Sequence, residues 1–517
     1  MNRAILSTVV LILTVTGCAS NPVTGKKQLK LVSSAQERAI GEQQYGPSRQ
    51  MQGGDYTIEP ELTAYVQEVG NRVARASGVN LPYEFTILNN SVPNAWAMPG
   101  GKIAINRGLL TEMNSEAELA AVLGHEVTHS AASHGASAMT RGMLLQIGMI
   151  AVQVGLRDND YAQYIVGGAN LGAQLISSKY GRDKELESDL YGMRFMSEAG
   201  YDPAAAVDLQ QTFVKISQGS GRRNDFISGL FASHPPSQQR VNTNRNTLTT
   251  LPPGGEYGRE RYQRMIAGIK RNAPAYKAHD DAVNSLREGN YQRATQLAQQ
   301  AINLEPRESK FYSLMGDTYR AKGDHTTAIQ FYNTSLERNS NHFQPYLTRA
   351  ISNLQLGNWQ VAEQDLKQSI RLLPTAPAYH QLGLIALETG RTQEAVQYLE
   401  QAATSDSDVG RAAGATLAKL QLQSNPERYL QGRLGLDNRG YLVVQIQNAA
   451  PVAVNNVQLA IVLLNQQGQI VQKETLNVRE TLPAQQVRNL PTRLGPITDQ
   501  NQLQFMRVVV ERAQVAQ

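Results

Sequence analysis

The chain has 517 residues, which is too long for one ordinary domain and predicts about three. Hydrophobic residues make up 41% and charged residues 18%, a composition that excludes a largely disordered chain. The formal net charge is only +5 and no long Lys/Arg block is present, so nothing predicts a nucleic-acid-binding surface. The single cysteine, Cys18, excludes a disulfide framework and a cysteine-based zinc cluster.

The first 17 residues have the pattern of a secretion signal. Arg3 gives a basic start, and residues 5–15 form an apolar run that is shorter than the roughly 20 residues needed to span a bilayer. Thr16 and Gly17 place small residues directly before Cys18. This arrangement resembles the lipobox of bacterial lipoproteins, in which the cysteine is acylated and becomes the N-terminus. The alternative is an ordinary secretory signal with an incidental cysteine.

The residues after the signal predict a tether and a location. Ala19, rather than an aspartate, follows the cysteine, and by resemblance to enterobacterial lipoproteins this favours the outer membrane. Residues 18–33 are expected to be a polar tether for a periplasmic, lipid-anchored protein. The apolar stretch 143–154 is too short to span a bilayer, so we interpret it as a buried helix rather than a membrane contact.

A helix with a metal-binding pattern is predicted to begin after Ser115, which forms a capping box with Glu118. His125 and His129 are four residues apart, so both imidazoles leave one helix face and can reach one zinc ion. Glu126 lies beside that face, where it can act as general base. A surface helix that carries these residues by chance is the alternative. It is disfavoured because the preceding run is apolar, and two buried, unpaired histidines would be costly.

A catalytic zinc needs a third protein ligand. His134 follows the motif by five residues, which does not fit the spacing of a metzincin. Glu185 and Asp189 share one helix face, so one can bind the metal while the other holds a ligand histidine. Because Lys184 and Glu187 are also present, a solvated charged helix remains the alternative.

The HExxH motif and the later ExxxD motif together resemble the zinc peptidase family that includes HtpX and the CAAX prenyl protease. The branch with a periplasmic signal and C-terminal tetratricopeptide repeats, the β-barrel assembly-enhancing proteases, is the most similar in organisation. The resemblance implies a mainly helical, gluzincin-like peptidase domain over residues 34–246. It also implies Zn²⁺ as cofactor, Glu185 as third ligand, Glu126 as base and Asp189 as a partner of a ligand histidine. The membrane-spanning helices of HtpX have no counterpart in this sequence.

Residues 94–106 match the segment that precedes the metal helix in this family. Two short apolar runs flank Pro99, Gly100 and Gly101, which predicts a hairpin close to that helix. An edge strand there could pair with an extended substrate backbone. A hairpin with a purely structural role is the alternative.

Residues 276–424 form a repeat with a period of 33 or 34 residues, which follows a polar linker at 247–275. Glycines recur at 289, 323, 357 and 390, and alanines recur five positions after each of them. This period resembles the tetratricopeptide repeat, and it predicts four helix pairs in an α-solenoid whose small residues allow close packing. Residues 428–517 instead alternate apolar and polar side chains, which predicts a small β-sandwich that serves as a packing or partner-binding module.

His234 precedes Pro235 and Pro236, which restrict its loop, and Arg240 follows six residues later. The resemblance implies that a histidine in such a Ser-His-Pro element can occupy the fourth zinc position. We therefore predict that His234 is a reversible, repressive ligand. The competing role for His234 or Arg240 is contact with substrate or stabilisation of the developing oxyanion.

The predicted protein is multidomain and α+β. Its predicted function is that of a zinc-dependent endopeptidase that degrades misfolded or stalled envelope proteins. Its expected partners are unfolded polypeptides and an envelope protein bound by the repeats, with the outer-membrane assembly machinery as a candidate. The alternative is a periplasmic chaperone or assembly scaffold that acts through the repeats and has a mainly structural or latent metal site.

Overall fold

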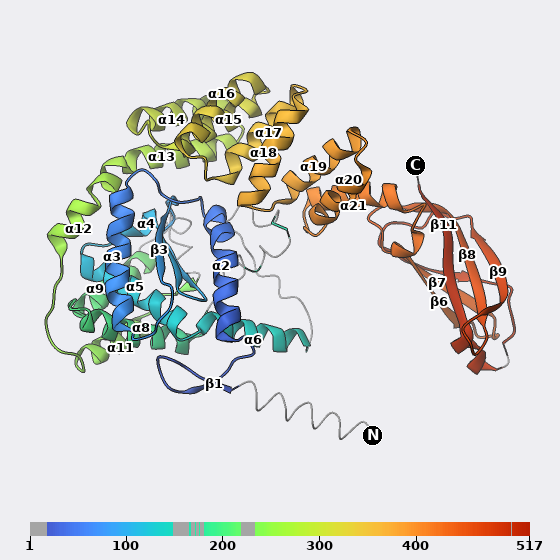
Figure 1. Ribbon diagram of the computed structural model, residues 1–517, viewed down its shortest axis with the longest axis horizontal. Helices are drawn as coiled ribbons and strands as arrows, with labels where there is room; N and C mark the ends of the chain where they lie inside the picture. The colour runs from blue at the N-terminus through green and yellow to red at the C-terminus, as the bar shows by residue number, and fades with distance from the viewer. Residues whose placement is uncertain are drawn as a thin grey trace. The chain divides into compact units, whose positions relative to one another are not determined.

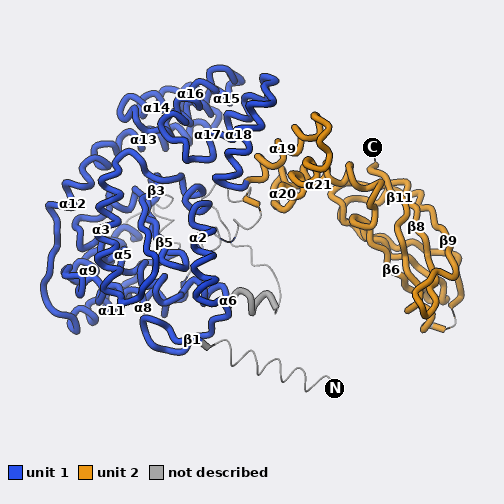
Figure 2. Tube along the Cα trace, in the orientation of Figure 1, with its two compact units in different colours: residues 1–162, 168–374 blue, residues 163–167, 375–517 orange. Residues whose placement is uncertain are grey.

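The computed structural model describes most of the chain and divides it into two compact units. Unit 1 comprises Met1–Ala162 and Gly168–Pro374, and unit 2 comprises Gln163–Gly167 and Thr375–Gln517 (Figure 2). The signal segment 1–17 and most of the apolar stretch 143–154 lie outside the described residues. No described helix is long and apolar enough to span a bilayer. The described residues are 18–147, 165–166, 171, 175, 180–218, 233–497 and 499–516.

The N-terminal part of unit 1 contains a three-stranded sheet with helices around it and a separate two-stranded hairpin (Figure 1). Its strands are β1 (Cys18–Ser20), β2 (Lys27–Leu29), β3 (Glu84–Leu88), β4 (Ala95–Met98) and β5 (Lys102–Asn106). Its helices are α2 (Ser34–Met51), α3 (Pro60–Ala76), α4 (Arg107–Leu110), α5 (Glu116–Ala131), α6 (His134–Ile147), α8 (Arg182–Glu198), α9 (Ala204–Gln218), α11 (Gln238–Leu248) and α12 (Arg259–Met265).

The central sheet has the order β3-β5-β4, with β3 parallel and β4 antiparallel to β5. Tyr45 of α2 packs with Trp96 and Met98 on one face, while Phe85 and Ile103 on the other join the main core with α3 and α5. The predicted hairpin is therefore present, and β4 is an edge strand. Its turn is attached to the metal helix, because the Ser130 hydroxyl accepts from the Gly101 amide and donates to the Met98 carbonyl.

The helix α5 begins as the sequence predicts, but with a different use of the capping glutamate. The Ser115 side chain accepts from the Glu118 amide at 3.1 Å. The Glu118 carboxylate accepts from the Asn114 amide rather than from that of Ser115. Every residue of α5 is buried, which explains why its apolar positions show no strong helical periodicity.

A pair of glycines sets the distance between α5 and α8. A Cβ on Gly192 would lie 2.8 Å from the backbone nitrogen of His125, and one on Gly124 would lie 2.9 Å from the carbonyl oxygen of Gly192. These contacts are with backbone atoms, which cannot rotate away as a side chain can. The absence of a Cβ on both helices therefore lets the backbone of the HExxH helix approach that of the Glu185 helix.

The segment expected to be a tether is attached to the peptidase region. The strands β1 and β2 pair as an antiparallel hairpin, and Asn21 between them is 3% exposed. The Asn21 amide donates to the Ala132 carbonyl, and Lys30 forms an ion pair with Glu37 at 2.7 Å. This segment is polar and has few apolar side chains to bury. It is nevertheless attached to the peptidase region, through hydrogen bonds and an ion pair of its side chains.

The repeats form helix pairs, as predicted, from α13 (Ala267–Arg287) onward. The pairs are α13 with α14 (Tyr291–Leu304), α15 (Ser309–Ala321) with α16 (His325–Arg338), α17 (Phe343–Gln355) with α18 (Trp359–Leu372), and α19 (Ala376–Glu388) with α20 (Thr392–Ala402). The recurring alanines are fully buried between helices. The recurring glycines instead end the first helix of each pair with a positive φ of 75–83°. They serve as helix stops rather than as contacts between helices.

Part of the expected linker is helical, because α12 and the first turns of α13 precede residue 276. The first helix pair and the start of α15 contact the sheet end of the peptidase region. The Asn89 amide donates to Glu308 at 3.0 Å, Lys310 donates to the Asn89 carbonyl, and the Tyr276 hydroxyl donates to Glu308. The guanidinium of Arg107 stacks on the Tyr276 ring at 3.4 Å. The buried polar groups at this junction are therefore paired with one another.

Unit 2 combines the last repeat with the predicted strand-rich module. After α21 (Asp408–Gln421) and η2 (Pro426–Arg428) come β6 (Leu430–Leu436), β7 (Leu442–Asn448), β8 (Val454–Leu464), β9 (Ile470–Val478), β10 (Val487–Pro491), η3 (Gln500–Phe505) and β11 (Met506–Val515). Two three-stranded antiparallel sheets, β10-β7-β6 and β11-β8-β9, share one apolar core. The predicted fold class, a helical peptidase region followed by an α-solenoid and a small β-sandwich, is confirmed.

The glycine contact gives a first prediction. Gly192→Ala should destabilise the protein by about 1–3 kcal/mol, because the new methyl group overlaps the α5 backbone. It should also reduce zinc content, since α5 carries both histidines of the motif. Thermal unfolding and metal analysis would measure the two effects. Gly181→Ala is the matched control, since it caps the same helix and a Cβ there meets nothing within 4 Å. Equal stability and zinc content in both variants would contradict the prediction.

Candidate metal centre

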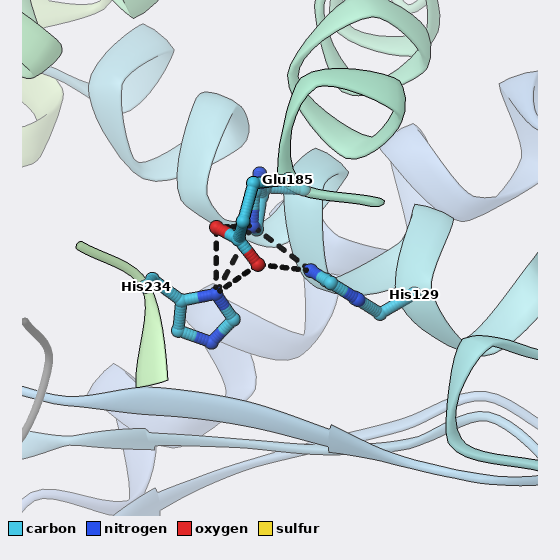
Figure 3. Close-up of side chains that lie close together, drawn as sticks. His129, Glu185 and His234 are labelled. Carbon is cyan, nitrogen blue, oxygen red and sulfur yellow. Dashed lines mark hydrogen bonds and ion pairs between the residues drawn. The ribbon is translucent and has the colours of Figure 1, made fainter. Parts of the chain in front are cut away.

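Four potential metal ligands converge between α5, α8 and the start of α11. His125 and His129 come from α5, Glu185 from α8, and His234 from the turn before α11 (Figure 3). One donor atom from each lies within 4.8 Å of all the others. All four side chains are buried. The structure thus brings together residues that are up to 109 positions apart in the chain.

The distances between donor atoms are short on every side of the cluster. The Nε2 atoms of His125 and His129 are 3.0 Å apart. Glu185 places one carboxylate oxygen 3.5 Å from the first of these nitrogens and the other 3.4 Å from the second. The Nδ1 atom of His234 lies 3.1 Å from Glu185 and 3.3 Å from His125. These atoms face one common point, as ligands of a single ion do.

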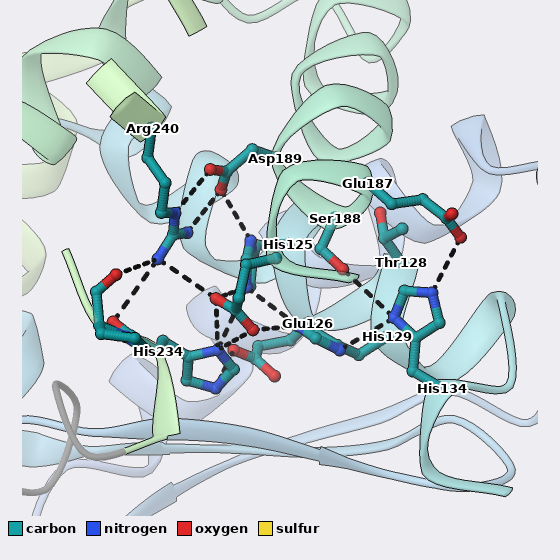
Figure 4. A network of polar contacts seen from close by, with 12 residues as sticks. His125, Glu126, Thr128, His129, His134, Glu187, Ser188, Asp189, His234 and Arg240 are labelled. Atoms are coloured by element: carbon teal, nitrogen blue, oxygen red, sulfur yellow. Dashed lines mark hydrogen bonds and ion pairs between the residues drawn. The ribbon is translucent and has the colours of Figure 1, made fainter. Parts of the chain in front are cut away.

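Asp189 and Arg240 form the outer support of His125 (Figure 4). The Nδ1 atom of His125 lies 3.0 Å from Asp189, and Arg240 donates to both oxygens of that carboxylate, at 2.6 and 2.7 Å. Burial raises the pKa of Asp189, but the guanidinium outweighs it and lowers the pKa below its usual value. Asp189 is therefore a carboxylate that accepts from the outer nitrogen of a candidate ligand.

His129 has a corresponding outer support that sequence reasoning missed. Its Nδ1 atom lies 3.1 Å from Nδ1 of His134, whose Nε2 lies 2.9 Å from Glu187. The five-residue spacing from His129 to His134 did not fit a metal ligand, and Glu187 supported only the alternative of a solvated charged helix. His134 is buried and Glu187 is half-buried. Together they complete a hydrogen-bonded series from His129 through His134 to the Glu187 carboxylate.

These outer contacts determine which ring nitrogens can bind a cation. The Asp189 carboxylate requires a hydrogen on Nδ1 of His125. Donation from His134 to Glu187 leaves Nδ1 of His134 as acceptor for Nδ1–H of His129. Both Nε2 atoms then present lone pairs across 3.0 Å, which requires a positive charge. Burial lowers the pKa of His125, yet the neighbouring carboxylates raise it to about 10, so the site attracts a cation. The donor set fits zinc.

Glu126 lies against the cluster without joining it. One oxygen is 3.6 Å from Nε2 of His234, and the other, Oε2, is buried and has no hydrogen-bond partner among the described residues. Burial raises the pKa of this carboxyl group. An uncommitted, buried carboxylate oxygen of raised pKa beside a metal site suits a group that accepts a proton.

Arg240 contacts the residues that surround the cluster. It is 5% exposed, donates to Asp189 and to the carbonyls of His234 and Pro235, and lies 3.2 Å from Glu185. These contacts direct the guanidinium at the supports of the cluster. Arg240 therefore holds Asp189 and the His234 turn in place.

Tyr180 is a further residue that the sequence analysis did not identify. Its ring stacks on that of His129, with centroids 4.0 Å apart and planes inclined by 30°. A Cβ on Gly135 would lie 3.9 Å from its hydroxyl oxygen. Tyr180 lies just before α8 and belongs to no motif, so its position at the site could be found only from the fold.

Comparison with known proteins identifies the region that contains this cluster. Residues 60–248 match the model of peptidase family M48. The chain carries a peptidase family M48 domain. Residues 282–342 and 376–409 match tetratricopeptide repeat models, as the 34-residue period predicts. The predicted enzyme class, a zinc metallopeptidase, is thereby confirmed, and zinc is the metal of this peptidase family.

Relatives of known name match parts of this chain at moderate identity. The β-barrel assembly-enhancing protease of Yersinia pestis is 26% identical over 64% of this chain and 72% of its own length. The metalloprotease LoiP of Escherichia coli is 27% identical over 48% of this chain and 97% of its own length. The mitochondrial metalloendopeptidase OMA1 of Schizosaccharomyces pombe is 29% identical over 43% of this chain. The matches span only 63% of OMA1 and 45% of the E. coli β-barrel assembly-enhancing protease.

The cluster predicts a defined metal content. Protein comprising residues 19–517 should bind about one zinc per chain, and His125→Ala combined with His129→Ala should abolish binding. Asp189→Ala should weaken zinc affinity about 10–100-fold, because the outer nitrogen of His125 loses its acceptor. Metal analysis and competition with a chromogenic chelator would measure both. Unchanged zinc in the double variant would show that the ion binds elsewhere.

Proposed function

We propose that the protein is a zinc-dependent endopeptidase of the bacterial envelope. The observation that carries the proposal is the position of Glu126. Its Oε2 is buried, has no hydrogen-bond partner in the part of the chain that the structure describes, and lies beside four convergent ligand atoms. A zinc site with a purely structural role needs no base at this place. The alternative, a chaperone or scaffold with a structural metal, leaves this carboxylate without a role.

The proposed roles follow from the contacts. His125, His129 and Glu185 hold the metal, which when bound would supply a Lewis acid for the scissile carbonyl. Glu126 takes a proton from the attacking water and returns it to the leaving amine. Asp189 keeps the hydrogen of His125 on Nδ1, so that Nε2 faces the ion, and Arg240 holds that carboxylate.

The proposed substrates are misfolded or stalled envelope proteins presented as extended chains. The edge strand β4 lies next to the metal helix, which supports pairing with an extended backbone. The repeats support protein–protein contacts, and the name of one bacterial relative, the β-barrel assembly-enhancing protease, points to β-barrel assembly. We therefore propose that the repeats bind an envelope protein, with the outer-membrane assembly machinery as candidate partner.

Replacement of the proposed base gives a direct test. Glu126→Gln should retain zinc and lose at least about 100-fold in cleavage of an unfolded model substrate, because the amide cannot take up the proton. Glu198→Gln, an exposed residue at the end of α8, is the matched control. Cleavage by Glu126→Gln at the wild-type rate would show that another group is the base.

We further propose that His234 represses the enzyme. Its Nδ1 lies among the ligand atoms and its ring is 6% exposed, so it is placed to fill the fourth ligand position and exclude the water that Glu126 would activate. The contacts of the ring support this role more than oxyanion stabilisation, which would need a donor directed at a substrate. Release would require movement of the turn before α11.

Removal of this imidazole distinguishes the two roles. His234→Ala should keep zinc and raise the cleavage rate of an unfolded substrate, since the fourth position opens to water. His325→Ala, on α16, is the control. An activity loss of about 10²-fold or more would instead assign His234 to catalysis and reject the repressive role.

The proposed location is the periplasmic face of the outer membrane, with Cys18 as the lipid-modified residue. The mature chain would begin at β1, and the hairpin of β1 and β2 would place the anchor beside the peptidase region. Cys18→Ala should move the protein from the membrane fraction to the soluble fraction, because acylation provides the membrane affinity. Continued membrane fractionation of this variant would point to attachment through a protein partner.

A further inference from the structure

A small cavity lies beside Glu126, away from the ligand atoms of His129. The helices α5, α8, α9 and α11 contact one another around it, and its volume is about 40 Å³. One part of its lining consists of His125, Glu126, Ser188, Asp189, His234 and Arg240. The apolar part of its lining is Ala121, Val122, Met193, Ala206, Leu209 and Phe213.

Two buried amides interrupt this apolar lining. Gln210 of α9 is 7% exposed and Asn244 of α11 is 2% exposed. The side-chain oxygens Oε1 of Gln210 and Oδ1 of Asn244 have no hydrogen-bond partner within the described part of the chain. A buried acceptor without a donor is unfavourable, and two in one cavity require an explanation. A ligand that donates hydrogen bonds would satisfy them.

The size and charge of the cavity restrict that ligand. A cavity needs about 10–15 Å³ to hold one water molecule, whereas about 150 Å³ accommodates benzene. The 40 Å³ here therefore suits a few heavy atoms and excludes an aromatic or long side chain. The carboxylate of Glu126 and the two acceptor oxygens disfavour an acidic group, and the guanidinium of Arg240 in the same lining is already paired with Asp189. A small, uncharged hydrogen-bond donor with an apolar side remains.

We propose that this cavity is a specificity pocket for a substrate side chain of the serine, threonine or asparagine type. Gln210 and Asn244 are its specificity-determining residues, since their oxygens accept from the hydroxyl or amide of the substrate. The apolar wall receives the methyl or methylene groups of that side chain. Because the pocket includes Glu126, the bound side chain belongs to a residue next to the scissile bond. This inference rests on the proposed peptidase function.

Threonine and valine provide the sharpest comparison, because they share a shape and differ in a hydroxyl group. Cleavage sites in an unfolded model substrate, located by mass spectrometry, would define a parent peptide. Peptides with Thr or Val at each position flanking the cleaved bond would then be compared. At one position we expect kcat/KM for Thr to exceed that for Val by about tenfold or more, because only Thr satisfies the buried acceptors.

Binding provides a readout that does not depend on turnover. The full mature chain with Glu126→Gln, loaded with zinc, should bind the fluorescently labelled Thr peptide about tenfold more tightly than the Val peptide. Fluorescence anisotropy would measure both dissociation constants. If the wild-type protein cleaves no peptide, the proposed peptidase function fails, and the ratio of dissociation constants still decides the assignment of the pocket.

Variants of Gln210 and Asn244 test whether these two amides recognise the substrate side chain. Gln210→Leu and Asn244→Leu should each reduce the Thr-to-Val ratio toward one, while Gln211→Leu on α9 and Asn242→Leu on α11 should retain it. Because leucine removes an unpaired acceptor, thermal stability should not fall, and a melting curve checks that each variant is folded. The wild-type comparison requires no variant and stands even if one fails to fold. Equal or preferred use of Val at every position, or a Thr preference that persists in both variants, would overturn the proposal.

Discussion

The close approach of α5 to α8 is the contact on which the metal centre depends. Gly124 and Gly192 leave no room for a Cβ between the two backbones, and this spacing brings His125 within 3.0 Å of Asp189. A wider separation would move Glu185 away from both histidines at once, since all the contacts between these residues cross the same helix interface. The HExxH pattern specifies ligands, but the pair of glycines specifies their distance from the third ligand.

The pairing of His125 with His129, and of Glu185 with Asp189, could be predicted from the sequence because helix geometry relates the two members of each pair. Residues four positions apart lie on the same face of a helix. His125 and His129 therefore share a face of α5, and Glu185 and Asp189 share a face of α8. The positions of His134, Glu187 and Tyr180 could not be predicted in this way. These residues make contacts across a stretch of the chain that contains no motif. A residue that contacts the outer ring nitrogen of a ligand histidine has no fixed spacing from that histidine in the sequence.

In the rest of the chain, too, regular sequence patterns were predictable and contacts between distant segments were not. The repeat was predictable because four glycines and four alanines recur at a constant period, although the glycines proved to end helices rather than to pack between them. The attachment of residues 18–33 was not predictable, because it depends on Asn21 reaching the carbonyl of Ala132. The alternating pattern of the C-terminal strands predicted their two sheets, since one face of each is buried in a common core.

The charges around the metal centre connect the proposed chemistry with its control. Glu126, Glu185 and Asp189 are buried carboxylates, and Arg240 is the one guanidinium in contact with them among the described residues, so two negative charges remain for a divalent cation to balance. With zinc bound, neutral histidines would complete the site without further charge. Exchange of His234 for a water molecule would replace one neutral ligand with another. The proposed repression by His234 would therefore be reversible without the cost of burying or exposing a net charge.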